Sequence, residues 1–281
     1  MDDRQGADAA AVLPGAETID LQEEGSPGVL LLHGFGDTPQ TVGLLARRLR
    51  KSGYSVLAPL LPGHGRSMTS FRKSRASDWI AAARGAYIAM HARHDSVSVV
   101  GLSMGGALGV LVAAEHRDIP ALVLIAPYLG MPRMLRVAAA THWLWGRLAG
   151  EVNARNPRSI RDPIEREKNL AYGTVTGREL HELSEVVSRA RKALKEVRSP
   201  TLIVQSREDP RILPDVAEFA LKTLGSEEKE LAWTEGAGHI ITVDYGRERV
   251  LGEVERWLGA HRRPGAAAAA AKRAAAERPT S

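Results

Sequence analysis

The sequence contains no cysteine, which excludes disulfide bonds, cysteine nucleophiles and thiolate metal sites. No apolar run approaches the roughly 20 residues that a membrane-spanning helix needs. The first residues, MDDRQGADAAAVLPGAE, are acidic and lack the apolar core of a secretory signal peptide. The 281 residues are 44% hydrophobic and 25% charged, which is typical of a globular protein with a sizeable core. We therefore expect a cytoplasmic protein.

The formal net charge of +5 comes mostly from one end of the chain. Residues 261–281 are alanine-rich and of low complexity, and their five basic side chains face a single acidic one, Glu277. Such a segment has no apolar face to bury, so we expect a disordered, solvated tail. Residues 1–18 are expected to be disordered as well. Because the excess charge lies in the tail, residues 19–260 give no indication of a nucleic-acid partner.

Short apolar runs alternate with stretches of helical pattern between residues 19 and 260. The runs are mostly unbroken and rich in β-branched residues, as in strands buried on both faces of a parallel sheet. The alternation predicts an α/β fold with a doubly wound, mostly parallel sheet that binds ligands at the carboxyl ends of its strands. The predicted strands are residues 28–32, 55–60, 96–101, 121–127, 201–206 and 229–233, with an early one near 19–23; the predicted helices are 39–51, 78–92, 104–116, 214–224 and 245–258.

One segment, residues 128–199, breaks the alternation because it contains no convincing strand. It separates two core strands, so we expect a helical cap at their carboxyl ends, inserted between core residues 19–127 and 200–260. Its first part, MPRMLRVAAATHWLWGRLAG, is apolar on most sides. We expect a helix buried between cap and core; the alternatives are an acyl-binding wall or a surface that faces a membrane.

Ser103 lies in the pentapeptide Gly101-Leu102-Ser103-Met104-Gly105, between a predicted strand and a predicted helix. The pattern G-x-S-x-G in this context is typical of a nucleophile elbow, in which the serine adopts a strained backbone on a tight turn. Gly101 and Gly105 are then required, because bulk at either position would clash. The helix that follows would favour negative charge near Ser103 through its amino-terminal end. We therefore predict that Ser103 is a nucleophile.

A serine hydroxyl needs a base, and the base needs a carboxylate to orient it. His239 is the best-placed histidine, because it follows the last predicted strand in a glycine-flanked loop, TEGAGHIITVD. Asp209 follows the preceding strand and is the favoured acid, with Glu208 and Asp215 as rivals. Because each member follows a different strand, the three side chains should meet at one edge of the sheet. The chain order Ser, Asp, His is one of those in which this triad occurs.

An acyl-transfer site also needs donors for the developing oxyanion. The backbone N–H of Met104 is one candidate, and that of Phe35, in the loop His33-Gly34-Phe35-Gly36 after an early strand, is the other. We assign His33 and His64, which lies in LPGHGRS, to loop structure and not to proton transfer.

These motifs resemble the α/β-hydrolase family over roughly residues 25–258. LLLHGFGDTP, PLLPGHGRS, VVGLSMGG, QSREDP and GHIITVDYGRERV occur in the family's order. HIITVD and the leucine of GLSMGG are most similar to bacterial carboxylesterases and monoacylglycerol lipases with a small cap. The resemblance implies no metal or cofactor, a cap from part of residues 128–199, and the roles assigned above to Ser103, Asp209, His239, Phe35 and Met104. Pro210 is a departure, because relatives carry a non-proline residue after the acid.

The resemblance implies hydrolysis of carboxylic esters, either short- to medium-chain acyl esters or monoacylglycerols, through an acyl-enzyme. Relatives with an aspartate nucleophile, the haloalkane dehalogenases and epoxide hydrolases, are set aside because position 103 is serine. C–C bond hydrolases, peptidases and perhydrolases share the triad and stay open, as does a slow-turnover receptor. Substrate, chain length and oligomeric state are not legible from the sequence.

Basic residues gather near the expected mouth of the site, in the loop after PGHG and in the insertion. They could steer anionic substrates or bring the protein weakly to acidic lipid headgroups, although a solvated rim is the simpler interpretation. The residues of the loop are Arg66, Arg72, Lys73 and Arg75.

Overall fold

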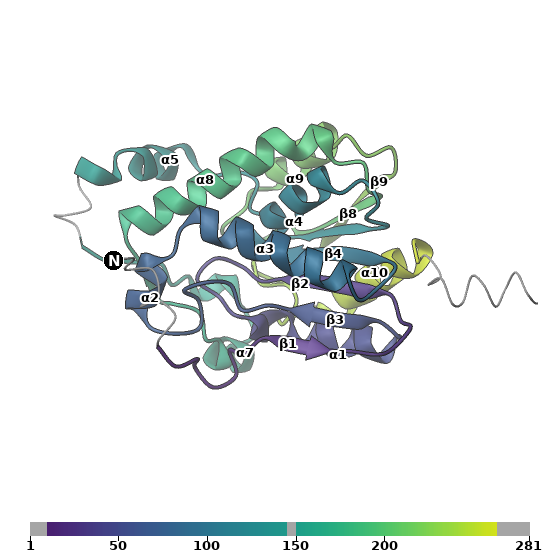
Figure 1. The fold of residues 1–281 in the computed structure, drawn as a ribbon. Coiled ribbons are helices and arrows are strands. Elements are labelled where there is room, and N and C mark those ends of the chain that lie inside the picture. Colours follow the sequence, from purple (N-terminus) through teal and green to yellow (C-terminus); the bar gives the residue numbers. More distant parts are fainter. Residues whose placement is uncertain (1–9, 145–149, 263–281) are drawn as a thin grey trace, which may run out of the picture.

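The computed structural model describes residues 10–144 and 150–262. Seven strands form the central sheet in the order β1-β3-β2-β4-β5-β8-β9 (Figure 1). All neighbouring strands are parallel except β1, which pairs antiparallel with β3. The strands are β1 (Ile19–Leu21), β2 (Gly28–Leu32), β3 (Ser55–Ala58), β4 (Val97–Leu102), β5 (Leu122–Ile125), β8 (Thr201–Ser206) and β9 (Lys229–Thr234). The predicted fold class is confirmed.

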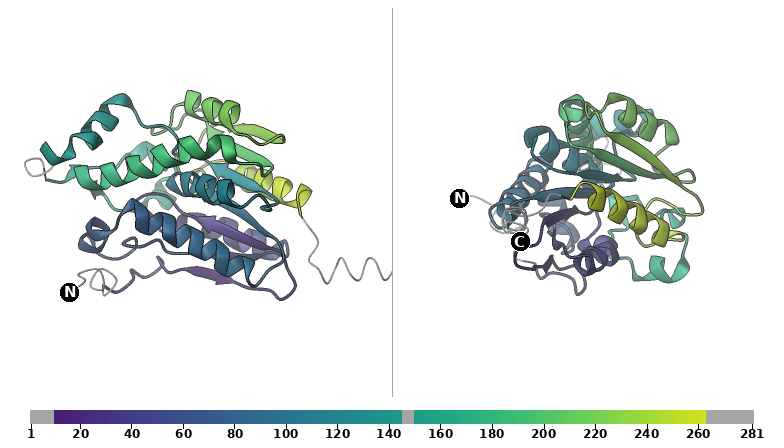
Figure 2. Two further views of the ribbon diagram at one scale, coloured as in Figure 1. Left: turned by 45° about the horizontal axis from the view of Figure 1, so that its top comes forward. Right: turned by 90° about the vertical axis from the view of Figure 1, so that its right-hand side faces the viewer.

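Helices cover both faces of this sheet, which gives three layers (Figure 2). One face is covered by α1 (Gly43–Lys51), which a short 3-10 helix (Pro39–Val42) precedes, and by α10 (Arg247–Ala260). The other face is covered by α3 (Ala76–His91), α4 (Met104–Glu115), α8 (Gly177–Ala193) and α9 (Pro214–Thr223). A short helix that the sequence pattern did not indicate, α2 (Met68–Lys73), precedes α3.

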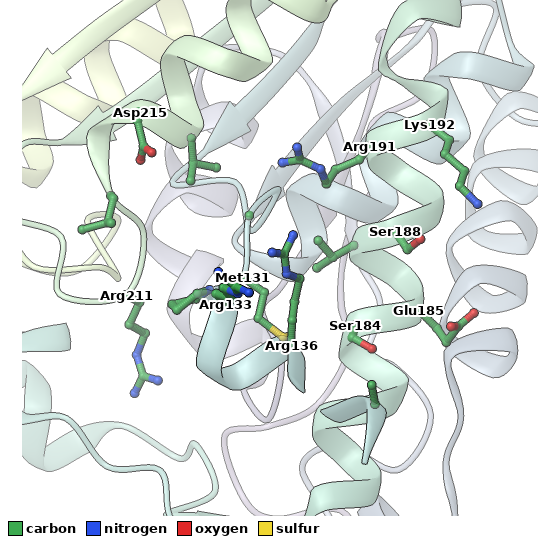
Figure 3. A pocket seen from close by; sticks show the side chains of 16 residues that line it. Met131, Arg133, Arg136, Ser184, Glu185, Ser188, Arg191, Lys192, Arg211 and Asp215 are labelled. Carbon is green, nitrogen blue, oxygen red and sulfur yellow. The ribbon is translucent and has the colours of Figure 1, made fainter. Parts of the chain in front are cut away.

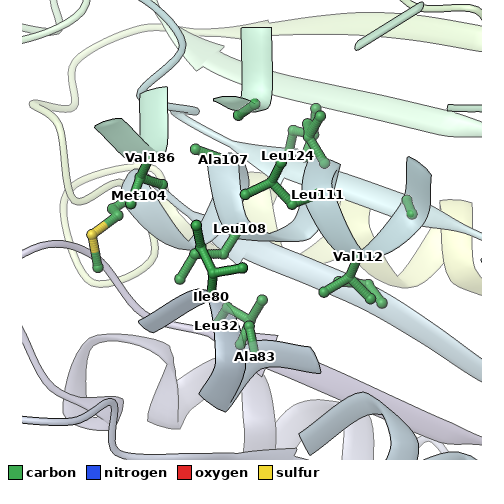
Figure 4. Packing of buried hydrophobic residues seen from close by; sticks show 14 of the residues in the cluster. Leu32, Ile80, Ala83, Met104, Ala107, Leu108, Leu111, Val112, Leu124 and Val186 are labelled. Atoms are coloured by element: carbon green, nitrogen blue, oxygen red, sulfur yellow. The ribbon is translucent and has the colours of Figure 1, made fainter. Parts of the chain in front are cut away.

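The unbroken apolar runs of the strands follow from this layering. Along β2, Leu30 and Leu32 face the layer of α3, α4 and α8, whereas Val29 and Leu31 face the layer of α1 and α10. Successive strand residues point to opposite faces, so a strand covered on both sides must be apolar at every position. Figure 4 shows the first of these clusters, in which Leu32 and Leu124 from the sheet meet Ile80 of α3 and Leu108 of α4.

The insertion between β5 and β8 differs from the prediction in two ways. It contains two short strands, β6 (Val152–Asn153) and β7 (Thr174–Val175), which pair antiparallel, in addition to α5 (Arg133–Ala140), α7 (Pro163–Lys168) and a 3-10 turn (Pro157–Ser159). Moreover, α8 packs on α4, and its Val186 and Ala190 are buried in the core. Helix α8 is therefore part of the layer beside the sheet, and the cap is smaller than residues 128–199.

The prediction of a buried helix at the start of the cap was wrong. In α5 only Ala139 is buried, while Met134 is 79% exposed and Val137 is 56% exposed. The helix is amphipathic: Leu135 packs against the core, and among the residues that the structure describes no further layer covers the opposite side. Within the described residues, no helix is long and apolar enough to cross a membrane.

Both ends of the chain were predicted to be disordered. Residues 10–18, which were expected to be disordered, lie against the core: Ala16 is buried, and the backbone N–H of Leu13 donates to the oxygen of Gly65 at 2.8 Å. These backbone contacts leave no pattern in the sequence. Of the predicted tail, 261–281, all but His261 and Arg262 lies outside the described residues.

Candidate active site

Ser103 lies on the turn between β4 and α4, with φ 56° and ψ −117°. A non-glycine residue is strained in this region of backbone space, and the surroundings hold it there. A Cβ at position 101 would lie 2.1 Å from the oxygen of Gly105, and a Cβ at position 105 would lie 2.0 Å from the oxygen of Leu32. Both glycines are therefore required by close backbone contact, as the elbow predicts.

The three predicted triad residues come together. The Nε2 atom of His239 lies 2.8 Å from Ser103 Oγ, and its Nδ1 atom lies 2.7 Å from Asp209 Oδ2. All three residues are between 4% and 8% exposed. Since the carboxylate can only accept, Nδ1 carries the proton and Nε2 is free to accept from the serine hydroxyl. The residues follow β4, β8 and β9, so the carboxyl ends of the strands meet as expected.

Asp209 is fixed by its own loop. Its Oδ1 atom accepts the backbone N–H groups of Arg211 (2.8 Å) and Ile212 (3.0 Å), and its Oδ2 atom also accepts from the Gln205 amide at 3.0 Å. Burial would raise the pKa of Asp209, but the charge and hydrogen bond of His239, together with these backbone donors, lower it below its ordinary value. Pro210 has no N–H group, and none is needed at that position.

The two rival carboxylates, Glu208 and Asp215, do not orient His239. Glu208 pairs with Arg161 at 2.8 Å and accepts the N–H of Gly236. Asp215 is exposed in the first turn of α9. His239 Nδ1 bonds to Asp209 and to neither of these two, so the geometry favours Asp209.

Both candidate oxyanion donors adjoin Ser103. Met104 is the first residue of α4, so its N–H has no acceptor within the helix. The loop that carries Phe35 abuts the nucleophile, since a Cβ at Gly34 would lie 3.3 Å from Ser103 Cβ. The Phe35 ring packs against Phe71 and Trp79, which holds this loop. The placement is consistent with the predicted oxyanion role, which stays a prediction.

His33 and His64 have structural contacts. The backbone N–H of Leu61 donates to Nε2 of His33, so the proton lies on Nδ1, which donates to the oxygen of Gly34. Burial lowers the pKa of His33 to about 4, so the ring is neutral at pH 7. His64 bonds through Nδ1 to the oxygen of Pro62, and burial lowers its pKa as well.

The triad opens into a cavity of about 370 Å³. Its polar lining includes Ser103, His239, Asp37 and Arg211, and α5, β7 and α8 contribute part of its apolar wall. A cavity of this size with one polar end suits a small substrate with an apolar chain. The larger aliphatic and phenylalanine side chains of the lining are Phe35, Leu102, Leu135, Val152, Val175, Leu180, Leu183 and Ile240. Among the described residues, no group of three or more His, Asp or Glu side chains could hold a metal ion.

Comparison with known families agrees with this geometry. The model of the Hydrolase_4 family, described as serine aminopeptidase, S33, matches residues 26–245. The chain belongs to this family. The predicted resemblance to α/β-hydrolases is thereby confirmed.

Relatives of this hydrolase agree with the finer resemblance. It is 32% identical over 242 residues to a thermostable monoacylglycerol lipase of Bacillus sp. (strain H-257), covering 85% of this chain and 93% of that protein. It is 25% identical over 236 residues to a carboxylesterase of Bacillus subtilis (strain 168), covering 83% and 93%. A solved structure from work on LipS and LipT, two metagenome-derived lipolytic enzymes, has a TM-score of 0.82 and 32% identity, covering 89% and 100%.

The structure of the hydrolase adds residues that sequence reasoning missed, and Asp244 is the first. This buried carboxylate accepts hydrogen bonds from the backbone N–H groups of four residues at 2.7 to 2.9 Å. Arg161 and Asp162 belong to the cap, and Gly238 and Tyr245 lie near Asp244 in sequence. Gly238 directly precedes His239, so Asp244 ties the base loop to the cap. The only signal in the sequence was the phrase HIITVD.

Ser159 and Arg211 form a second tie. The oxygen of Ser159 accepts the N–H groups of His239 and Ile240, both at 2.9 Å. Its hydroxyl accepts from Nε of Arg211 at 2.7 Å, and Arg211 also donates to the oxygen of Ala154 at 2.9 Å. One cap segment, residues 154–162, therefore bonds both to the loop that carries Asp209 and to the loop that carries His239.

Asp37 is the third residue that was missed. It lines the cavity and accepts the N–H of Thr38 and the hydroxyl of Thr41, both at 2.8 Å. Burial raises the pKa of Asp37 to about 6 despite these bonds and the charges of His239 and Arg211. The sequence placed it only in a glycine-rich loop.

Proposed function

We propose that this protein is a serine hydrolase that cleaves carboxylic esters, namely short- to medium-chain acyl esters or monoacylglycerols. The observation that carries the proposal is the hydrogen-bonded chain Asp209–His239–Ser103 beside a cavity with apolar walls. The names of the two Bacillus relatives support the choice of esters. The proposed setting is the cytoplasm, the proposed substrate is a small molecule, and the mechanism below requires no cofactor.

In the first step, Ser103 Oγ attacks the ester carbonyl carbon while His239 Nε2 accepts the hydroxyl proton. The backbone N–H groups of Phe35 and Met104 are proposed to hold the oxyanion of the tetrahedral intermediate. His239 then gives the proton to the alcohol oxygen as the carbon–oxygen bond breaks. The alcohol leaves, and the acyl group stays on Ser103.

In the second step, His239 accepts a proton from water, whose oxygen attacks the acyl-enzyme. Collapse of the second tetrahedral intermediate returns the proton to Ser103 Oγ and releases the carboxylic acid. Asp209 stays ionised throughout and stabilises the imidazolium, which agrees with its lowered pKa.

A peptidase is the second reading, and the family description names one. An aminopeptidase needs an anionic group for the substrate's amino terminus. Among the described residues that line the cavity, Asp37 is the only acidic one, and its oxygens are engaged by Thr38 and Thr41. The lining therefore favours an acyl chain over a charged amine.

Steady-state hydrolysis of p-nitrophenyl esters from acetate to palmitate tests the proposal. We expect turnover that falls by about 10⁴-fold or more in S103A. S77A, which changes an exposed serine on α3, is the matched control and should keep full activity. Ester turnover that survives S103A would contradict the nucleophile. Turnover of aminoacyl p-nitroanilides without ester turnover would favour a peptidase, and one product per protein followed by a stall would favour a receptor.

A further inference from the structure

A groove of about 730 Å³ lies between α5, α8 and the amino-terminal turn of α9 (Figure 3). It contains none of the triad residues, and Arg211 is the only residue that the catalytic cavity shares with it. Ester hydrolysis gives this groove no role. Its lining is nevertheless unusual in charge.

Five basic side chains line the groove against two acidic ones. Of the acidic pair, Glu185 lies 3.7 Å from Arg189, outside the lining, and Asp215 lies in the first turn of α9, where the helix end stabilises a negative charge. Within the described chain, none of the basic side chains lies within 4.0 Å of a carboxylate oxygen. These side chains are Arg133, Arg136, Arg191, Lys192 and Arg211.

Arg191 is held in place without a counter-ion. Its guanidinium donates to the oxygen of Leu129 at 2.6 Å and lies over the Phe219 ring at 4.0 Å. Burial, and then the charge of Arg136, lower the pKa of Arg191. Figure 3 shows both guanidinium groups extending from facing helices into the same space. Two like charges thus share the groove, which is unfavourable unless an anion joins them.

We propose that this groove binds a phosphate group between Arg136 and Arg191. A guanidinium offers a planar pair of N–H donors that matches two phosphate oxygens, and a phosphate monoester carries enough charge to satisfy both arginines. Lys192 and the hydroxyls of Ser184 and Ser188 lie in the same lining. The phosphate could belong to a soluble phosphate ester or to the headgroup of phosphatidic acid, since both are phosphate monoesters.

Occupancy of the groove would act on the catalytic cavity through α5. Arg136 faces the groove, and its neighbour Leu135 lines the catalytic cavity. A phosphate that joins α5 to α8 would fix the position of Leu135 as a cavity wall. Binding itself can be measured without ester turnover, so failure of this proposal is distinguishable from failure of the proposed hydrolase function.

The test uses the full chain in phosphate-free buffer. Calorimetric titration with glycerol 3-phosphate and inorganic phosphate probes the soluble source, and co-sedimentation with vesicles of phosphatidylcholine, with or without phosphatidic acid, probes the lipid source. Arg136 is exposed, so R136Q should fold, and we expect it to weaken binding by about tenfold or more. R136K should bind more tightly than R136Q but less tightly than the parent, because lysine keeps the charge without the planar pair of donors. R249Q, on α10 across the sheet, is the matched control.

Each outcome decides the proposal. Binding of the soluble phosphates that R136Q weakens and R249Q does not supports a soluble ligand. Binding only to vesicles that contain phosphatidic acid, with the same response to the variants, supports a lipid headgroup. No binding to any probe overturns the site. Equal weakening by R136Q and R249Q also overturns it, because the attraction would then reflect net charge alone.

Discussion

The two parts of the cap are attached to the core in different ways. Residues 154–162 bond to the acid and base loops through buried polar groups, among them Asp244 and Ser159. Helix α5 instead packs through Leu135 and Ala139 and leaves Met134 and Val137 exposed. One part of the cap is therefore bonded to the loops that carry Asp209 and His239, whereas the other packs through apolar side chains and keeps exposed apolar residues on its outer side.

Asp244→Asn should break the first attachment and have the largest effect. The new amide nitrogen would face either the N–H of Gly238 or those of Arg161 and Asp162, so a donor would oppose a donor in a buried place. We expect the free energy of unfolding to fall by about 2–4 kcal/mol. We also expect kcat to fall, because Gly238 precedes His239. Denaturant unfolding and ester kinetics measure both effects.

Asp215→Asn is the control for this substitution, because Asp215 is exposed on α9. Its effect on the unfolding free energy should stay below about 1 kcal/mol. Equal unfolding midpoints for D244N and the parent would show that the first attachment contributes nothing.

Asp37 sharpens the comparison, because it is a buried carboxyl whose own hydrogen bonds are to Thr38 and Thr41 and not to the cap. Its pKa is raised from 3.8 to about 6, so the folded state holds the proton more tightly than the unfolded state. The protonated Asp37 carboxyl therefore contributes about 3 kcal/mol to the free energy of unfolding. This contribution is fully present below about pH 4 and is lost as the pH rises through about 6.

In Asp37→Asn the side chain is neutral at every pH, so the variant should not lose this stability as the pH rises. Denaturant unfolding of the parent and D37N between pH 4 and pH 7 should show the parent losing about 2–3 kcal/mol relative to the variant. Parallel curves would mean that Asp37 does not titrate in this range.

Neighbouring residues on α5 give the smallest and most direct comparison. Leu135→Ser places a hydroxyl in the wall of the catalytic cavity. We therefore expect the free energy of unfolding to fall by about 1–2 kcal/mol and the KM for long-chain esters to rise. Met134→Ser changes a side chain that is 79% exposed, so we expect the free energy of unfolding to change by less than about 0.5 kcal/mol. Similar effects of both variants on KM would contradict the placement of α5 as a cavity wall.

The sequence predicted the features that depend on local pattern. Strands covered on both faces must be apolar throughout, so the sheet could be predicted. The glycines around Ser103 are required by close backbone contact, which made the elbow predictable, and the positions of Asp209 and His239 after predicted strands could be predicted as well. The exposure of α5 could not, because an apolar composition does not say whether a further layer covers the helix.

The ties between cap and catalytic loops were not legible for a different reason. Asp244 accepts from backbone N–H groups more than 80 positions away, and Ser159 accepts through its backbone oxygen. Apart from the missing N–H of proline, backbone groups are the same in every residue, so the backbone partners of these contacts produce neither a periodicity nor a residue-type signal. The short strands β6 and β7 and the packing of residues 10–18 escaped prediction in the same way.

The backbone of Ser103 has a consequence for the evolution of the protein. A left-handed conformation costs a residue with a Cβ about 1–2 kcal/mol, and glycine adopts it freely. Ser103→Gly should therefore yield an inactive protein that is more resistant to unfolding than the parent. Stability alone would favour glycine at position 103, so a serine there agrees with its proposed role as the nucleophile.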